Sequence, residues 1–304
     1  MNTPAALRIL RADHLGMCFG VRDALALAHR EAARQPVTIL GDLVHNETVL
    51  EDLRNRGVRL EQNLEAVETP TVLITAHGAS EKRIAAVAAR GHRLVEATCP
   101  LVHFAHRAVR SLVAEGYHPV IVGRRDHVEV RGMTEDLEAF DVVLTEADVD
   151  GLTPRERFGV AAQTTQPIPR VRTLVDRLRH RFPRATVRFV DTVCQPTKQR
   201  QDAAEHLAKV ADVVVVVGGA NSNNTRELAQ TCRSHGARVH QVLSAAQLRE
   251  EWFQSGEIVG ITAGTSTPEV TIEGVERWLH ALASRGLPKA GTIRRPDGAT
   301  IAVT

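Results

Sequence analysis

The chain enters an expected helix through Glu96-Ala97-Thr98-Cys99-Pro100-Leu101. Two other stretches follow the same plan, Gly16-Met17-Cys18-Phe19-Gly20-Val21 and Asp191-Thr192-Val193-Cys194-Gln195-Pro196. In all three, a cysteine stands just before a stretch whose apolar residues have helical spacing. We interpret the three cysteines as equivalent positions of a threefold internal repeat.

Polar residues recur at matching places after each cysteine. His45, His127 and Ser222 end the first buried strand of their repeats, and His77, Thr164 and Ser266 end a later one. Strands that alternate with helices indicate parallel sheets covered by helices. In such sheets, ligands bind beyond the carboxyl ends of the strands. The repeat therefore predicts one polar ring around one centre, with the three cysteines in its floor.

The predicted fold is α/β, with three pseudo-threefold-related lobes whose small, mostly parallel sheets surround a central metal cluster. The expected lobes span residues 1–97, 98–192 and 193–285. Residues 286–304 lack helical periodicity and are expected to pack back on the body as an extended strand.

Composition excludes several classes of partner. The 304 residues carry a net charge of +2 and only 3% aromatic side chains, which argues against nucleic-acid binding. No apolar run reaches the length of a membrane span, and the first ten residues do not form a signal peptide. We therefore expect a cytoplasmic protein with reduced cysteines. The fourth cysteine, Cys232, has no counterpart in the repeat and is expected to be structural.

Three thiols without a fourth partner suit a [4Fe–4S] cluster that leaves one iron without a cysteine ligand. Soft sulfur ligands favour iron–sulfur clusters or zinc, so a zinc site on Cys18, Cys99 and Cys194 is the chemical alternative. Structural zinc ligands usually come in close pairs, and these cysteines are far apart in the chain. A third interpretation is three unrelated buried cysteines. Helix N-termini behind Cys99 and Cys194 are expected to help keep the thiols ionised.

The polar ring is suited to an anionic or phosphorylated ligand. Its histidine, serine and asparagine side chains offer many hydrogen-bond donors: His45, His77, His127, Ser222, Asn224 and Ser266. Gly218-Gly219-Ala220-Asn221-Ser222 before a helix resembles an anion-binding turn. Taken singly, each residue is as well explained by a helix cap or a solvated strand end.

Glu129 follows His127 at the mouth of the same strand. A carboxyl group there can deliver protons if burial raises its pKa. From spacing alone, an exposed Glu129 is about equally expected.

Together these stretches resemble the 4-hydroxy-3-methylbut-2-enyl diphosphate reductase family. The matching signatures run in the family's order from about Arg8 to Ser284: Gly16-x-Cys18-x-Gly20-Val21, Val44-His45-Asn46, Ala76-His77-Gly78, Ala97-Thr98-Cys99-Pro100-Leu101-Val102, His127-x-Glu129, Gln163-Thr164-Thr165, Asn221-Ser222-x-Asn224 and Thr262-Ala263-Gly264-x-Ser266-x-Pro268.

The resemblance implies a two-electron reductive dehydroxylation that yields isopentenyl and dimethylallyl diphosphate. It implies one [4Fe–4S] cluster per chain on Cys18, Cys99 and Cys194, with Glu129 as the proton donor and Thr164 orienting the allylic hydroxyl. A ferredoxin or flavodoxin would supply the electrons. The diphosphate of the substrate would be held by His45, His77, His127, Ser222, Asn223, Asn224 and Ser266.

The chain departs from the family's usual pattern at three places. Arg131 stands where an acid is usual, Asn223 where a second serine is usual, and Gln195-Pro196 where Tyr-Ala is usual. Two alternative hypotheses therefore remain: a paralogue with the same cluster that acts on a different allylic diphosphate, and a non-enzymatic iron–sulfur sensor.

Overall fold

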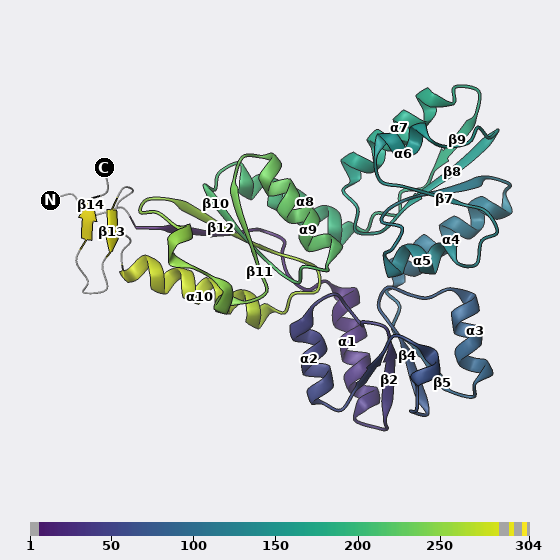
Figure 1. Cartoon of the computed structure of the whole chain (residues 1–304), viewed down its shortest axis with the longest axis horizontal. Helices are drawn as coiled ribbons and strands as arrows, with labels where there is room; N and C mark the ends of the chain where they lie inside the picture. The colour runs from purple at the N-terminus through teal and green to yellow at the C-terminus, as the bar shows by residue number, and fades with distance from the viewer. Residues whose placement is uncertain (1–5, 286–291, 295–299, 303–304) are drawn as a thin grey trace. The chain divides into compact units, whose positions relative to one another are not determined.

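The computed structural model describes residues 6–285, 292–294 and 300–302. These residues form two compact units. We call residues 18–198 the cysteine unit, and residues 1–17 with 199–304 the terminal unit. Figure 1 labels their helices and strands.

The cysteine unit contains two four-stranded parallel sheets with the same plan. One has the order β3-β2-β4-β5 and the other β7-β6-β8-β9. Their strands are β2 (Val37–Leu40), β3 (Arg59–Glu61), β4 (Thr71–Ile74), β5 (Arg93–Glu96), β6 (His118–Val122), β7 (Asp141–Val143), β8 (Arg157–Ala162) and β9 (Thr186–Phe189). The helices between them are α1 (Phe19–Ala32), α2 (Glu47–Asn55), α3 (Glu81–Ala89), α4 (Pro100–Ala114), α5 (Val128–Thr134), α6 (Glu146–Asp150) and α7 (Ile168–Arg181).

The terminal unit is built on a third parallel sheet, of order β1-β12-β10-β11. Its strands are β1 (Arg8–Arg11), β10 (Val213–Val217), β11 (Arg238–Val242) and β12 (Ile258–Ala263). The helices are α8 (Gln195–Ala208), which begins in the cysteine unit, α9 (Asn223–Ser234) and α10 (Glu269–Arg285). Short 3₁₀ turns lie at Leu64–Ala66 in the cysteine unit and at Ala245–Gln247 and Glu250–Trp252 in the terminal unit.

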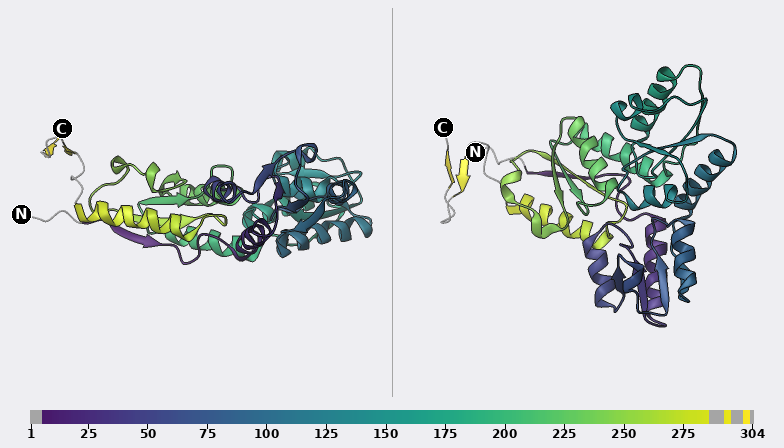
Figure 2. Two further views of the ribbon diagram at one scale, coloured as in Figure 1. Left: turned by 90° about the horizontal axis from the view of Figure 1, so that it is seen from below. Right: turned by 45° about the vertical axis from the view of Figure 1, so that its right-hand side comes forward.

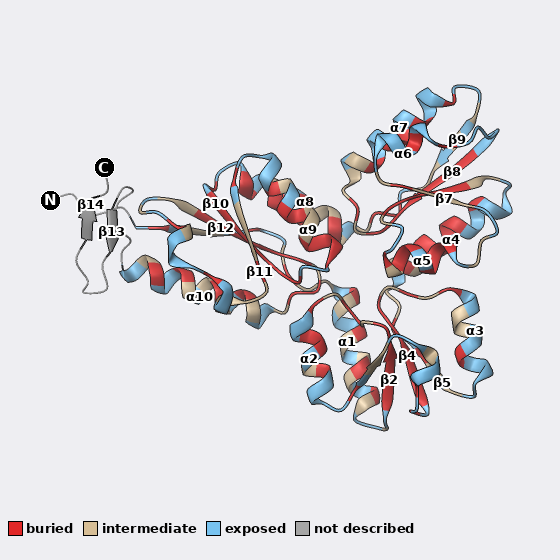
Figure 3. Ribbon diagram, viewed as in Figure 1, coloured by how far each residue is buried: buried red, intermediate tan, exposed pale blue. Residues whose placement is uncertain are grey.

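Burial on both faces explains the composition of the central strands. β10 consists of five consecutive valines, all fully buried. Val213, Val215 and Val217 pack in a cluster with α10, whereas Val214 and Val216 pack in another with α8 and α9. α10 therefore covers one face of this sheet, and α8 and α9 cover the other. Figure 2 gives two further views of the ribbon, and the burial colouring shows the central strands as the core (Figure 3). Cys232 is part of the second cluster, as its expected structural role requires.

The predicted lobe boundaries are wrong at the N-terminus. We assigned residues 1–97 to one lobe, but β1 pairs in parallel with β12 of the third sheet. The reason is that the edge strand before each cysteine belongs to the sheet of the preceding repeat, and the first repeat is preceded by the third. β5 and β9 are the edge strands that lead to Cys99 and Cys194, and β1 is the corresponding edge strand that leads to Cys18. The third repeat therefore takes its last strand from the start of the chain.

The prediction for residues 286–304 mostly lies outside the described residues. Within the tail, β13 (Thr292–Arg294) and β14 (Thr300–Ala302) pair with each other in antiparallel fashion. Among the helices of the described part of the chain, none is long and apolar enough to cross a membrane.

Candidate functional site

Three histidines from the two sheets of the cysteine unit face one another. His45 follows β2, His77 follows β4 and His127 follows β6. The ring centres of His45 and His77 lie 4.5 Å apart, and that of His127 lies 5.1 Å from His45 and 5.6 Å from His77. The carboxyl ends of these strands therefore bring the three imidazoles together, as the repeat predicts.

The histidine cluster disfavours its own protonation. Burial, and then the neighbouring imidazoles of His45 and His127, hold the pKa of His77 well below its usual range. Nδ1 of His77 has no hydrogen-bond partner among the described residues. An anion placed here would supply the missing partner and favour the protonated imidazoles.

His127 also organises the helix that carries Glu129. Its Nδ1 accepts a hydrogen bond of 3.1 Å from the backbone N–H of Glu129 and so caps α5. Because Nδ1 is an acceptor, the proton of a neutral His127 sits on Nε2.

Glu129 and Thr164 form a buried pair. They are only 1% and 4% exposed. Thr164 donates twice to the carboxyl group, from its backbone N–H to Oε1 at 2.6 Å and from its hydroxyl to Oε2 at 3.0 Å. The side chain of Glu129 is therefore buried, and the interpretation of an exposed glutamate is excluded.

Burial gives Glu129 the acidity of a proton donor at neutral pH. Burial raises the pKa of Glu129 to about 7, against the opposing effect of the two hydrogen bonds from Thr164. At neutral pH a substantial fraction of this carboxyl group is protonated. Efficient general acids have a pKa near the working pH.

The three predicted cysteine ligands are free thiols at helix starts. Cys18 and Cys99 are the N-cap residues of α1 and α4, and Cys194 directly precedes α8. The negative charges of Cys18 and Glu129 raise the pKa of both other thiols, so these groups lie within electrostatic reach of one another.

N–H groups at the helix starts favour the ionised thiols, as expected, but burial has the larger effect. Burial raises the pKa of Cys99, and it raises the pKa of Cys194 to about 11. Backbone N–H groups of Leu101 and Val102 favour ionised Cys99 but do not outweigh burial. Among the described residues, no three His, Cys, Asp or Glu side chains are arranged to hold a single metal ion.

The terminal unit carries its own anion-binding feature at the start of α9. Ser222 caps this twelve-residue helix by accepting from the backbone N–H of Thr225 at 3.3 Å. Oδ1 of Asn224 accepts from the N–H of Thr265 at 3.0 Å, which leaves the buried Nδ2 group without a partner in the described residues. Asn223 and Ser266 are buried as well. A helix N-terminus with an unsatisfied amide donor favours an anion.

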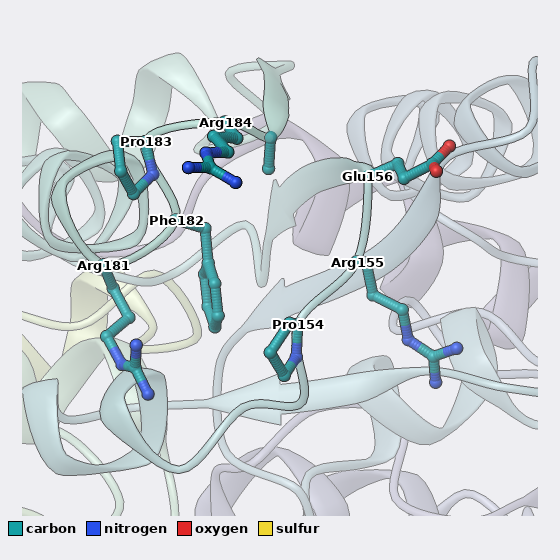
Figure 4. Close-up of a pocket in the computed structure, with 8 residues that line it drawn as sticks. Pro154, Arg155, Glu156, Arg181, Phe182, Pro183 and Arg184 are labelled. Atoms are coloured by element: carbon teal, nitrogen blue, oxygen red, sulfur yellow. The ribbon is translucent and has the colours of Figure 1, made fainter.

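A surface pocket of about 480 Å³ is not part of this chemistry. It is lined by Pro154–Glu156 and Arg181–Ala185, and Figure 4 shows its side chains. These residues precede β8 and β9, whereas Thr164 follows β8. The pocket is therefore at the amino ends of the strands, opposite the candidate site.

Arg131, which stands where an acid is usual in the family, makes no hydrogen bond to the Glu129 side chain within the described part of the chain. Arg131 is exposed on α5, and residues two apart on a helix do not face each other. The hydrogen bonds that reach the Glu129 side chain come from Thr164.

Two features of the site were missed in the sequence. One is Thr197, whose hydroxyl lies 3.1 Å from the Sγ atom of Cys194. The other is the contact of Gly20 with Cys99: a Cβ atom added to Gly20 would overlap Sγ and lie 3.1 Å from Cβ of Cys99. Both residues lie close to a cysteine in the sequence, Gly20 two residues after Cys18 and Thr197 three residues after Cys194.

In the described residues, fold and site define an α/β protein of three four-stranded parallel sheets. Three thiols stand at helix starts, and three imidazoles and one buried carboxyl group follow strand ends. The chain belongs to the LytB family, because the family model described as LytB protein matches residues 9–280.

The chain matches curated relatives over nearly their whole length. A 4-hydroxy-3-methylbut-2-enyl diphosphate reductase of Anaeromyxobacter sp. (strain Fw109-5) is 37% identical over 282 residues, which are 91% of this chain and 98% of the relative. The reductase of the same name from Aquifex aeolicus (strain VF5) is 36% identical over 88% of this chain and 94% of the relative.

Solved structures agree with the fold. The structure of (E)-4-hydroxy-3-methyl-but-2-enyl diphosphate reductase, named as the terminal enzyme of the non-mevalonate pathway, is 34% identical with a TM-score of 0.66 and covers 90% of this chain and 99% of that one. A reductase structure from Plasmodium falciparum is 24% identical with a TM-score of 0.84, covers 90% of this chain and 88% of that one, and supports the fold alone.

Proposed function

We propose that the protein is an oxidoreductase that converts 4-hydroxy-3-methylbut-2-enyl diphosphate to isopentenyl and dimethylallyl diphosphate. The observation that carries the proposal is the buried Glu129–Thr164 pair at the same strand ends as three clustered histidines. A proton donor beside an anion-binding cluster is what loss of a hydroxyl from a diphosphate ester requires.

The thiols fit a [4Fe–4S] cluster with one iron free of cysteine. Cys18, Cys99 and Cys194 are free thiols of intermediate exposure, and the charges of Cys18 and Glu129 influence the pKa of Cys99 and Cys194. Cysteine sulfur is a soft ligand, which favours an iron–sulfur cluster. When bound, such a cluster supplies the electrons of the reaction one at a time.

The side chains perform the remaining steps. In the balanced reaction, the substrate, two electrons and two protons give the product and one water. Glu129 delivers the proton that leaves with the hydroxyl as water, and Thr164 orients that hydroxyl. His45, His77 and His127 bind the diphosphate through charge-assisted hydrogen bonds.

The terminal unit offers a second set of side chains for an anion. Ser222, Asn223, Asn224 and Ser266 are assigned to an anion of the same class, because the α9 N-terminus offers buried donors. The proposed electron donor is a small redox protein, a ferredoxin or flavodoxin. The proposed location is the cytoplasm, where thiols are kept reduced.

Diphosphate binding is expected to take up protons through the histidine cluster. His77 is neutral in the free protein because its pKa is lowered, and a bound anion raises that pKa. Affinity should therefore fall as pH rises, by about tenfold per unit for each proton taken up. Calorimetry of inorganic diphosphate binding between pH 6 and 8 measures the slope.

The ligand's own titration is shared by every variant and does not disturb the comparison. His77→Asn should flatten the slope, whereas His29→Asn, on α1 beside Asp52, should leave it unchanged. Equal slopes in wild type and His77→Asn would show that His77 gains no proton on binding.

Anaerobic reconstitution with iron and sulfide tests the function itself. We expect a brown protein whose absorption shows an iron–sulfur cluster, and formation of both five-carbon diphosphates when substrate and a reduced electron donor are added. A cluster that forms without any substrate consumption would contradict the assigned reaction, and absence of a cluster would contradict the ligand set.

A further inference from the structure

Thr197 contacts the third cysteine from within α8. Its Oγ1 atom lies 3.1 Å from Sγ of Cys194, and its side chain is fully buried. Its backbone N–H bonds to the carbonyl oxygen of Cys194 at 3.1 Å. The side chain and the backbone of Thr197 therefore both contact Cys194.

This contact breaks the threefold repeat. Thr197 stands three residues after its cysteine, and the residues at the same distance after Cys18 and Cys99 are Val21 and Val102. Valine has the shape of threonine but no hydroxyl, so these positions cannot donate to sulfur. The third cysteine therefore differs from the other two by one hydrogen-bond donor.

Cys194 is also the cysteine connected to the acid. Its backbone N–H donates to the carbonyl oxygen of Thr164 at 3.0 Å. Thr164 in turn holds Glu129 through its N–H and its hydroxyl. Thr197 on one side and Thr164 on the other therefore fix the position of this one ligand.

We propose that Thr197 is a positioning residue whose hydroxyl donates to the Cys194 thiolate and raises the midpoint potential of the bound cluster. The proposal rests on the iron–sulfur function proposed above. A thiolate has no proton of its own, so the bond between the two side chains must then run from the hydroxyl to sulfur. Reduction adds one electron, whose charge is partly on the ligand sulfurs. A donor stabilises that more negative state more strongly and makes reduction easier.

Thr197→Val removes the hydroxyl and makes the third repeat match the first two. Thr197→Ser keeps the hydroxyl. Thr192→Val is the matched control: Thr192 is 2% exposed and close to Cys194 in the chain, but its hydroxyl bonds to the backbone of Ala162. All variants are reconstituted anaerobically, and the cluster is titrated with dithionite while the reduced form is followed by electron paramagnetic resonance.

The expected result is a more negative midpoint potential in Thr197→Val, with Thr197→Ser and Thr192→Val at the wild-type value. Loss of the cluster in Thr197→Val alone, with retention in Thr197→Ser, would also support the positioning role. Equal potentials in wild type and Thr197→Val overturn it, as does loss of the cluster in both valine variants. If the wild type itself binds no cluster, the proposed function fails and the role of Thr197 fails with it, whereas a wild-type cluster with equal potentials overturns the role of Thr197 alone.

Discussion

Replacing Glu129 by Gln is expected to lower turnover by a factor of about 10² to 10⁴, the range that a positioned proton donor contributes. The amide has the size of the carboxyl group, and its oxygen can still accept from the N–H of Thr164, which now lies 2.6 Å from Oε1. The cysteines are not altered, so cluster content should stay at the wild-type value. Product formation and iron content are measured on the same sample.

A matched control separates this chemistry from a change in charge. Glu138→Gln removes an exposed carboxyl group a short way along the chain from the same helix and should leave turnover unchanged. Turnover of Glu129→Gln within about threefold of the wild type would show that the proton comes from elsewhere.

The same substitution has a pH-dependent effect on stability. The pKa of Glu129 is raised to about 7 in the fold from 4.5, so the folded state keeps its proton where the unfolded state has lost it. The contribution of this group to the free energy of unfolding is fully present below pH 4.5. It is lost as pH rises through about 7, which lowers the free energy of unfolding by about 3 kcal/mol. The free energy of unfolding of Glu129→Gln minus that of the wild type should therefore be larger at pH 8 than at pH 5. Denaturant unfolding of both proteins at the two pH values measures this difference.

Element boundaries were predictable where local chemistry determines them. α2 begins at Glu47 because Asn46 caps it, and it ends just before the chain turns at Gly57, so both bounds follow from local residue chemistry. No helix is predicted at α5 from the sequence. What makes it helical is its cap, the imidazole of His127.

The position of β1 and the burial of Glu129 depend on contacts far apart in the chain. β1 has only two apolar residues, Ile9 and Leu10, and its place is set by pairing with β12. Glu129 is buried because β8 ends beside it and Thr164 covers the carboxyl group. The spacing of His127 and Glu129 could indicate a shared strand end but not the direction of either side chain. The matched positions of the repeats therefore predict where the site lies. The burial of Glu129, which gives it a raised pKa, depends on packing between distant parts of the chain.

Gly20→Ala is expected to abolish stable cluster binding. Gly20 is the second residue of α1, where alanine would ordinarily stabilise a helix by about 1 kcal/mol. Here the new Cβ would overlap Sγ of Cys99 and lie 3.1 Å from its Cβ. Cys99 is the N-cap of α4 and cannot move without moving the start of that helix. The thiol should therefore turn away from its ligand position.

Iron and sulfide content after anaerobic reconstitution measures the effect, together with thermal unfolding of each variant. Gly274→Ala is the matched control, because Gly274 also lies inside a helix, α10, and an added Cβ would meet only the end of the Arg277 side chain at 4.0 Å. That variant should keep the full cluster and gain stability. If Gly20→Ala also kept a full cluster, Cys99 would not need its position beside Gly20, and its place among the three ligands would be in doubt. Because of this contact, a substitution that would ordinarily stabilise a helix tests whether Cys99 is a cluster ligand.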